Sequence, residues 1–204
     1  MPRKTVPDAN TRARILDVGA RLLFENGFDG TSIRSIMNAA GANVGMFYYY
    51  FGGKDELIHE IIMGFFEPYR ADLEVIVNDA HNVPYHAIVR FFKYVEGCVR
   101  AFRIKYGSRI HSSVRMAIRE HSLTVMVPYM ESIINTMIEY GANPSMDAHT
   151  MAIFLSHGIG NCLLLEKSDW VENVADDLTR TIDLIMGIDE NAARIMQQRG
   201  TQLN

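Results

Sequence analysis

Apolar residues recur at helical spacing along this chain. The first stripe has small or apolar residues at i, i+4, i+7 and i+8, namely Ile15, Gly19, Leu22 and Leu23. It predicts an amphipathic helix over about residues 10–25, which Asn26-Gly27 would end. We see no strand-like alternation of apolar and polar residues and no internal repeat, so we expect an all-α protein.

Further helical stretches follow residue 54. Glycine, proline and polar clusters separate them, notably Gly107-Ser108 and the loop Gly141-Ala142-Asn143-Pro144. The predicted helices cover about residues 55–80, 85–105, 108–119, 123–140, 146–166 and 171–186, with a short helix within 189–204. Pro68 should bend the first of them, and Pro128 should lie near the first turn of the fourth.

Between residues 30 and 51 the pattern is helix, tight turn, helix. The hydroxyl of Thr31 can N-cap a short helix, which Gly41 can end in the left-handed conformation. Asn43 is a good N-cap for a second helix over residues 44–50. This order predicts a helix-turn-helix at about residues 32–50, whose second helix enters the DNA major groove.

The second of these helices is aromatic on every side. Phe47 and Phe51 are four residues apart and can share the inward face, which leaves Tyr48 and Tyr49 to donate their hydroxyls to phosphate oxygens. Packing within a small helical domain is the alternative explanation of such a run. The register of the run with the turn and the caps favours DNA binding.

Two residues beside the aromatic run support this interpretation. Gly45 inside so short a helix costs about 1 kcal/mol relative to alanine, so a close backbone approach should require it. Lys54 follows Gly52-Gly53 at the start of the next helix, where exposed N–H groups already favour an anion. With the tyrosines, these residues would form a phosphate clamp.

The motif positions of this stretch are Ala40-Gly41, Gly45, Phe47-Tyr48, Tyr50-Phe51 and Lys54-Asp55-Glu56-Leu57, with Arg14-Ile15-Leu16 and Asn26-Gly27-Phe28 before them. Together they resemble the DNA-binding motif of the TetR family of bacterial transcriptional regulators. The resemblance implies that one set of residues faces base edges or nearby backbone: Arg34, Asn43, Val44 and Met46. It implies that another set holds phosphates: Ser32, Tyr48, Tyr49 and Lys54.

Four positions depart from the family pattern. Met37 stands where the family usually has alanine and Ala42 where it usually has valine, so we expect volume to be exchanged between the two helices. Val44 and Met46 replace residues that are usually polar, which favours contacts with thymine methyl groups over hydrogen-bonded readout. The same replacement supports an alternative function: a helical ligand-binding or interaction protein that kept the fold but lost sequence-specific DNA binding.

The charge is divided unevenly along the chain. Residues 1–54 hold seven Lys and Arg against four Asp and Glu, a net charge of +3, although the whole chain carries −4. The other 150 residues hold 13 Lys and Arg against 20 Asp and Glu, a net charge of −7. This asymmetry suits a DNA-binding domain at residues 1–54 and a helical effector-binding and dimerisation domain at residues 55–204.

The two predicted helices over residues 146–166 and 171–186 carry broad apolar stripes. Two such antiparallel helices can meet the same pair of a second subunit and form a two-fold four-helix bundle, which is also the usual dimer interface of the family. The expected interface residues are Phe154, Gly158, Cys162, Leu178, Ile182 and Ile185. Packing inside one subunit is the alternative, because periodicity does not say what a stripe faces.

The middle of the chain is rich in methionine and aromatic residues. Each one alone is explained by a helical core, but together they would suit an apolar or planar small molecule between helices, and the family resemblance implies such an effector. The candidate effector-binding residues are Phe66, Tyr69, Phe92, Met116, Met126, Tyr129 and Phe154.

Other kinds of function have no support in the sequence. The seven histidines and two cysteines show no metal-ligand or redox spacing, so we expect no metal and no cofactor. No glycine-rich phosphate loop, nucleophile elbow or carboxylate pair marks a catalytic residue, although an enzyme built on this scaffold is a third alternative. No apolar run reaches the roughly 18 residues that span a bilayer, so we expect a cytoplasmic protein.

The sequence therefore predicts a homodimeric regulator that binds a palindromic double-stranded DNA operator. We expect a repressor that a small apolar or aromatic effector releases from DNA. The resemblance implies that effector binding moves the helix over about residues 55–80, which changes the separation of the two recognition helices.

Overall fold

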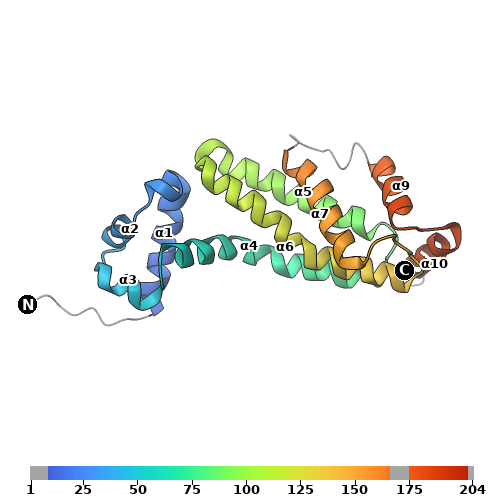
Figure 1. Cartoon of the computed structure of the whole chain (residues 1–204), viewed down its shortest axis with the longest axis horizontal. Coiled ribbons are helices and arrows are strands. Elements are labelled where there is room, and N and C mark those ends of the chain that lie inside the picture. The colour runs from blue at the N-terminus through green and yellow to red at the C-terminus, as the bar shows by residue number, and fades with distance from the viewer. Residues whose placement is uncertain (1–8, 166–174, 202–204) are drawn as a thin grey trace, which may run out of the picture. The chain divides into compact units, whose positions relative to one another are not determined.

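A computed structural model describes residues 9–165 and 175–201. Its helices (Figure 1) are α1 (Ala9–Gly30), α2 (Ile33–Ala39), α3 (Val44–Tyr50), α4 (Lys54–Asp79), α5 (Ala87–Tyr106), α6 (Ser112–Glu139), α7 (Ala148–Leu165), α9 (Ala175–Ile185) and α10 (Glu190–Thr201), with a short 3₁₀ helix, η1 (Gly107–Arg109). No strand occurs in the described ranges, which confirms the all-α fold. The expected first residues of the helix over 171–186 lie outside the described residues.

The described residues form two compact units. The N-terminal unit contains residues 9–68 together with Tyr106–Arg119, and the C-terminal unit contains Tyr69–Lys105 and the described residues from Glu120 onward. Three helices, α4, α5 and α6, contribute residues to both units.

In the N-terminal unit, helix α1 packs through the stripe expected from the sequence. Ile15 and Leu23 are buried, and a Cβ atom at Gly19 would lie 3.2 Å from Ile61 Cδ1 and 3.3 Å from Leu57 Cδ2. Gly19 therefore lets α1 lie close against α4, because even the Cβ of alanine would press on the ends of these two side chains.

The expected helix end at Asn26-Gly27 corresponds to a break inside α1. Gly27 has φ 74° and ψ −175°, a conformation that is essentially restricted to glycine, and helical residues resume after it as far as Gly30.

Helix α6 corrects one prediction. A single helix, Ser112–Glu139, replaces the two helices expected over 108–119 and 123–140. No glycine or proline lies between residues 119 and 123 to stop a helix, and buried positions continue through Ile118 and Leu123. Pro128 lies in the helix interior with its side chain exposed, where water can solvate the carbonyl that its missing N–H leaves without a helical bond.

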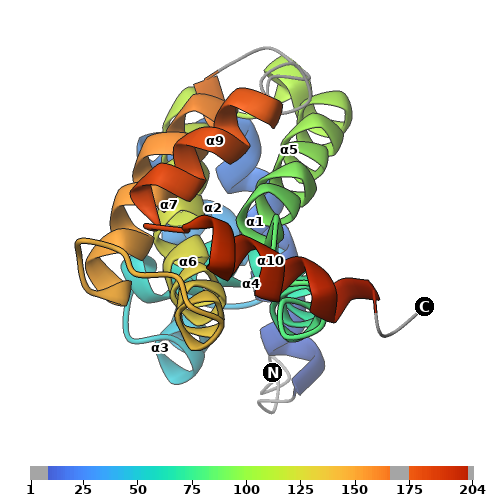
Figure 2. The ribbon, with the colours of Figure 1, turned by 90° about the vertical axis from the view of Figure 1, so that its right-hand side faces the viewer.

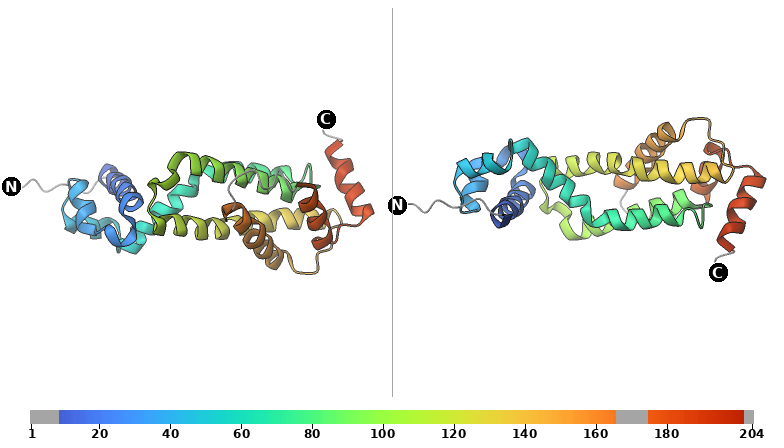
Figure 3. Two further views of the ribbon diagram at one scale, coloured as in Figure 1. Left: turned by 90° about the horizontal axis from the view of Figure 1, so that it is seen from above. Right: turned by 90° about the horizontal axis from the view of Figure 1, so that it is seen from below.

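The core of the C-terminal unit is built mainly from α5, α6, α7, α9 and α10. Its largest fully buried side chains are Phe91, Phe92, Ile88, Met130 and Ile133. Helix α10 lies at the end of this unit in both views of Figure 3 and adds Ala192 and Met196 to the core. Figure 2 shows the turn over residues 186–189 that joins α9 to α10.

Candidate nucleic-acid interface

The start of α2 is fixed by two neighbouring hydroxyls with different roles. Ser32 is the N-cap: its Oγ accepts from the Ser35 backbone N–H at 3.0 Å, and the Ser32 N–H donates to Ser35 Oγ at 3.0 Å. Thr31 is 2% exposed, and its hydroxyl donates instead to the carbonyl of Leu22 in α1. The expectation that Thr31 caps the helix was therefore wrong, since that hydroxyl joins α2 to α1.

The turn between α2 and α3 has the predicted glycine geometry. Gly41 has φ 63°, its N–H donates to the carbonyl of Asn38, and the N–H of Ala42 donates to the carbonyl of Met37 at 3.0 Å. This pair of bonds is a Schellman motif, which satisfies the last carbonyls of α2. Asn43 caps α3 as expected, because its Oδ1 accepts from the Met46 N–H at 3.0 Å.

The aromatic run of α3 divides between core and surface. Phe47 and Phe51 are buried at 0% and 1% exposure, whereas Tyr48 and Tyr49 are 62% and 69% exposed. Each exposed ring packs edge-on against a neighbour, Tyr48 on Phe47 at 5.4 Å and Tyr49 on Tyr50 at 5.0 Å between centroids. The two exposed tyrosines are thus held on the outside of the recognition helix.

The other predicted contact residues of α2 and α3 are mostly on the surface. Ser32, Arg34, Asn43, Val44 and Gly45 are all exposed. Met46 is different: it is 6% exposed and belongs to the core of the N-terminal unit. Because the core encloses its side chain, Met46 is not placed to reach bases.

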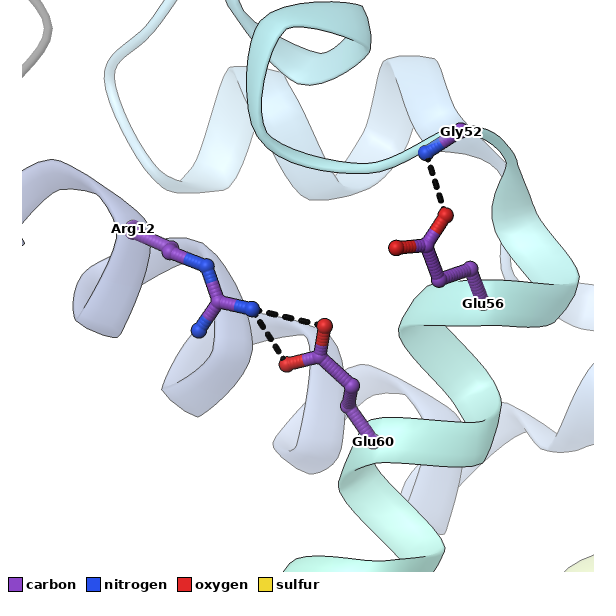
Figure 4. A network of polar contacts seen from close by, with 4 residues as sticks. All are labelled: Arg12, Gly52, Glu56 and Glu60. Carbon is purple, nitrogen blue, oxygen red and sulfur yellow. Dashed lines mark hydrogen bonds and ion pairs between the residues drawn. The ribbon is translucent and has the colours of Figure 1, made fainter.

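Lys54 already has one intramolecular partner. Its ammonium donates to the carbonyl of Phe28 at 2.5 Å, which joins the first residue of α4 to the end of α1. An ammonium has three donors, so two N–H groups are left for a phosphate. The nearby N–H of Gly52 donates to Glu56 Oε2 at 2.6 Å (Figure 4), so this donor is occupied.

An ion pair holds α1 against α4, and sequence reasoning missed it. The Arg12 guanidinium donates to both carboxylate oxygens of Glu60 at 2.6 Å (Figure 4), and it lies 5.0 Å from the centre of the Phe51 ring. The partners lie 48 residues apart, so no local pattern in the sequence could have indicated this contact.

The N-terminal unit also includes the start of α6, which the sequence did not predict. The N–H of His111 donates to the carbonyl of Phe24 at 2.8 Å, and a Cβ atom at Gly27 would lie 2.2 Å from His111 Nδ1. The Phe24 and Tyr106 rings meet edge to face at 6.1 Å between centroids. Residues 106–119 therefore brace the helix that supports the helix-turn-helix.

The candidate effector residues do not form a single cluster. Phe92 and Met126 are buried in the core of the C-terminal unit, and Tyr129 packs against that core. Phe66 and Tyr69 are half-buried on α4, in the N-terminal and the C-terminal unit respectively. Met116 belongs to the N-terminal unit at 71% exposure, and Phe154 is 52% exposed.

The candidate dimer residues divide between the two helices that carry them. On α7, Phe154, Gly158 and Cys162 are exposed at i, i+4 and i+8. On α9, Leu178 and Ile182 are 7% and 3% exposed within the core of their own subunit, and Ile185 is half-buried. The α9 stripe therefore packs internally, as the alternative interpretation had it.

The described residues contain no helix that is long and apolar enough to cross a membrane. In the same part of the chain, no group of three or more His, Cys, Asp and Glu side chains is placed to hold a metal ion.

Comparisons with known proteins agree with the geometry. Residues 15–61 match the model of the bacterial regulatory proteins of the tetR family. The region over residues 15–61 is therefore similar to the TetR family of regulators. The match runs from Ile15 in α1 to Ile61 in α4 and so covers the whole helix-turn-helix.

Two relatives match part of this chain. The chain is 28% identical over 121 residues to the HTH-type transcriptional repressor KstR2 of Rhodococcus jostii, covering 51% of this chain and 59% of the relative. It is 44% identical over 62 residues to the HTH-type transcriptional regulator AcrR of Shigella flexneri, covering 30% of the chain and 29% of the relative. Both matches thus span less than two thirds of the relative's length.

A solved structure extends the likeness to the fold of most of the chain. Reduced E. coli NemR superposes with a TM-score of 0.51 at 14% identity, covering 87% of this chain and 98% of NemR. At that identity the likeness concerns the fold alone.

Proposed function

We propose that this protein is a TetR-family DNA-binding transcriptional regulator and that it acts as a repressor. The observation that carries the proposal is the exposure of Tyr48 and Tyr49 on a helix whose caps, turn and core match a helix-turn-helix. The relative KstR2 is a transcriptional repressor, which supports repression over activation for this protein.

The proposed interface has two kinds of contact. Phosphates are held by Ser32, Tyr48, Tyr49 and Lys54, which fix the position of the protein on the duplex. The bases and the nearby DNA backbone are contacted by Arg34 on α2 and by Asn43, Val44 and Gly45 at the start of α3.

The proposal includes a homodimer on a palindromic operator. The exposed stripe of Phe154, Gly158 and Cys162 on α7 supports a two-fold helical interface. In such a dimer the recognition helices sit about 34–36 Å apart, one turn of the DNA helix.

Regulation in this proposal depends on an apolar or aromatic effector held by the C-terminal unit. The buried Phe92 and Met126 and the partly buried Tyr129 supply an adaptable, uncharged lining. The effector releases DNA only if it binds the DNA-incompetent state better, with a coupling of about 1–3 kcal/mol.

The DNA-binding step is tested by removing one hydroxyl. In an electrophoretic mobility shift with the DNA upstream of its own gene, wild-type protein should form a specific complex. Tyr48→Phe should bind about tenfold more weakly per half-site, because each subunit loses one charge-assisted bond of about 1.5 kcal/mol to a phosphate.

The matched control is Tyr140→Phe, which removes a hydroxyl in the C-terminal unit that donates to the His81 carbonyl. It should leave the affinity for DNA unchanged. Only weak, salt-sensitive association of the wild-type protein would favour the alternative, a helical ligand-binding protein that no longer reads a DNA sequence.

A further inference from the structure

Val44 is the side chain through which the start of α3 can meet a base edge. The N-terminal residues of a recognition helix lie nearest the bases. Among the first three residues of α3, Met46 is buried and Gly45 has no side chain, while Val44 is 41% exposed. The helix therefore presents the two methyl groups of Val44 to the groove at this position.

The preceding residue, Asn43, uses part of its side chain to cap α3. Asparagine reads adenine with its carbonyl oxygen and its amide nitrogen together. Here Asn43 Oδ1 accepts from the N–H of Met46 at 3.0 Å, so the cap of α3 uses one of the two lone pairs of this oxygen and holds the side chain against the helix. Val44 follows it as the exposed apolar side chain at the start of α3.

Gly45 supplies the space that a short side chain needs. A Cβ atom there would meet only Asn43 Oδ1, at 3.2 Å, and the residue does not have a positive φ. That contact is tight and falls on the oxygen that caps α3, so alanine would press on the cap. The backbone conformation itself does not require glycine, and glycine weakens a helix relative to alanine. A partner outside the protein that approaches this backbone closely would explain it, and valine reaches a base only at such close range.

We propose that Val44 recognises a thymine in each half-site by contact with its C5-methyl group, and that Gly45 admits the duplex closely enough for this contact. The C5-methyl of thymine is the one apolar group that the four bases present in the major groove. The inference rests on the proposed function and adds to it the base and the chemical group that are read.

The test uses the duplex that wild-type protein selects from a random DNA library. Each thymine of that duplex is replaced in turn by uracil, which removes one methyl group and changes no hydrogen bond. At one thymine of each half-site, the replacement should weaken wild-type binding about fourfold per half-site, the effect of exposing one buried methyl group.

Two variants of α3 complete the experiment. Val44→Ala should bind the thymine and uracil duplexes equally, and its exposed position keeps the fold intact, which thermal unfolding confirms. Gly45→Ala should bind DNA more weakly and lose the same discrimination, with its folding checked by the same thermal unfolding. Tyr48→Phe should bind both duplexes more weakly while keeping the thymine-to-uracil ratio of wild type.

Two results would overturn the inference, and they are distinguishable. If a sequence is selected but no uracil replacement matters, or if Val44→Ala keeps the wild-type ratio, the reading by Val44 is wrong while the proposed function stands. If no sequence is selected from the library, the proposed function fails and this inference fails with it.

Discussion

A single buried hydroxyl in α7 provides a prediction at the scale of one residue. Ser156 is 0% exposed, and its Oγ has no hydrogen-bond partner. An unsatisfied buried hydroxyl destabilises a core, so Ser156→Ala should raise the free energy of unfolding by about 1 kcal/mol. Denaturation in urea measures the change.

Thr136→Val is the matched control, because the buried Thr136 hydroxyl donates to the Ser132 carbonyl at 3.1 Å. This change should lower the free energy of unfolding by about 1 kcal/mol. Equal losses in the two variants would mean that Ser156 Oγ makes a hydrogen bond after all.

Residue-level predictions from the sequence succeeded where the cause is local. Gly41 and Asn43 act through their own backbone conformation and a neighbour three or four residues away, and both were placed correctly. The roles of Thr31 and Ser32 could not be separated in this way. Either hydroxyl can cap a helix, and the choice depends on the Leu22 carbonyl, which only the folded chain brings near.

At the scale of elements, the contact between α1 and the start of α6 can be tested at Gly27. Gly27→Ala should destabilise the protein by about 3 kcal/mol, since alanine resists this conformation and its Cβ would overlap His111. Gly64→Ala is the control: its Cβ would meet nothing within 4 Å, so it should stabilise α4 by about 1 kcal/mol. Thermal unfolding of both variants measures the difference, and equal melting temperatures would show that the contact with His111 does not form.

Helix positions were predictable, whereas the partners of helix faces were not. The periodicity of α9 is the same whether Leu178 and Ile182 face another subunit or their own core, so the sequence left both possibilities open. In α6 the sequence between residues 119 and 123 lacks a breaker, and only the continuous packing through Leu123 decides that one helix forms.

For the whole molecule, the proposed dimer links the exposed face of α7 to DNA binding. Phe154→Glu places a charge on a side chain that is 52% exposed, so the subunit should still fold while the proposed interface is disrupted. Light scattering should then report a monomer. Operator affinity should fall about 100-fold, because two linked helix-turn-helix units bind far more tightly than one.

Val75→Glu controls for the added charge, because Val75 is an apolar residue of α4 that is 65% exposed and lies outside the proposed interface. It should leave both the dimer and the affinity intact. A Phe154→Glu protein that stays dimeric would move the interface away from α7. One that becomes monomeric yet binds its operator at full strength would show that each subunit reads DNA alone, and the operator would then need no two-fold symmetry.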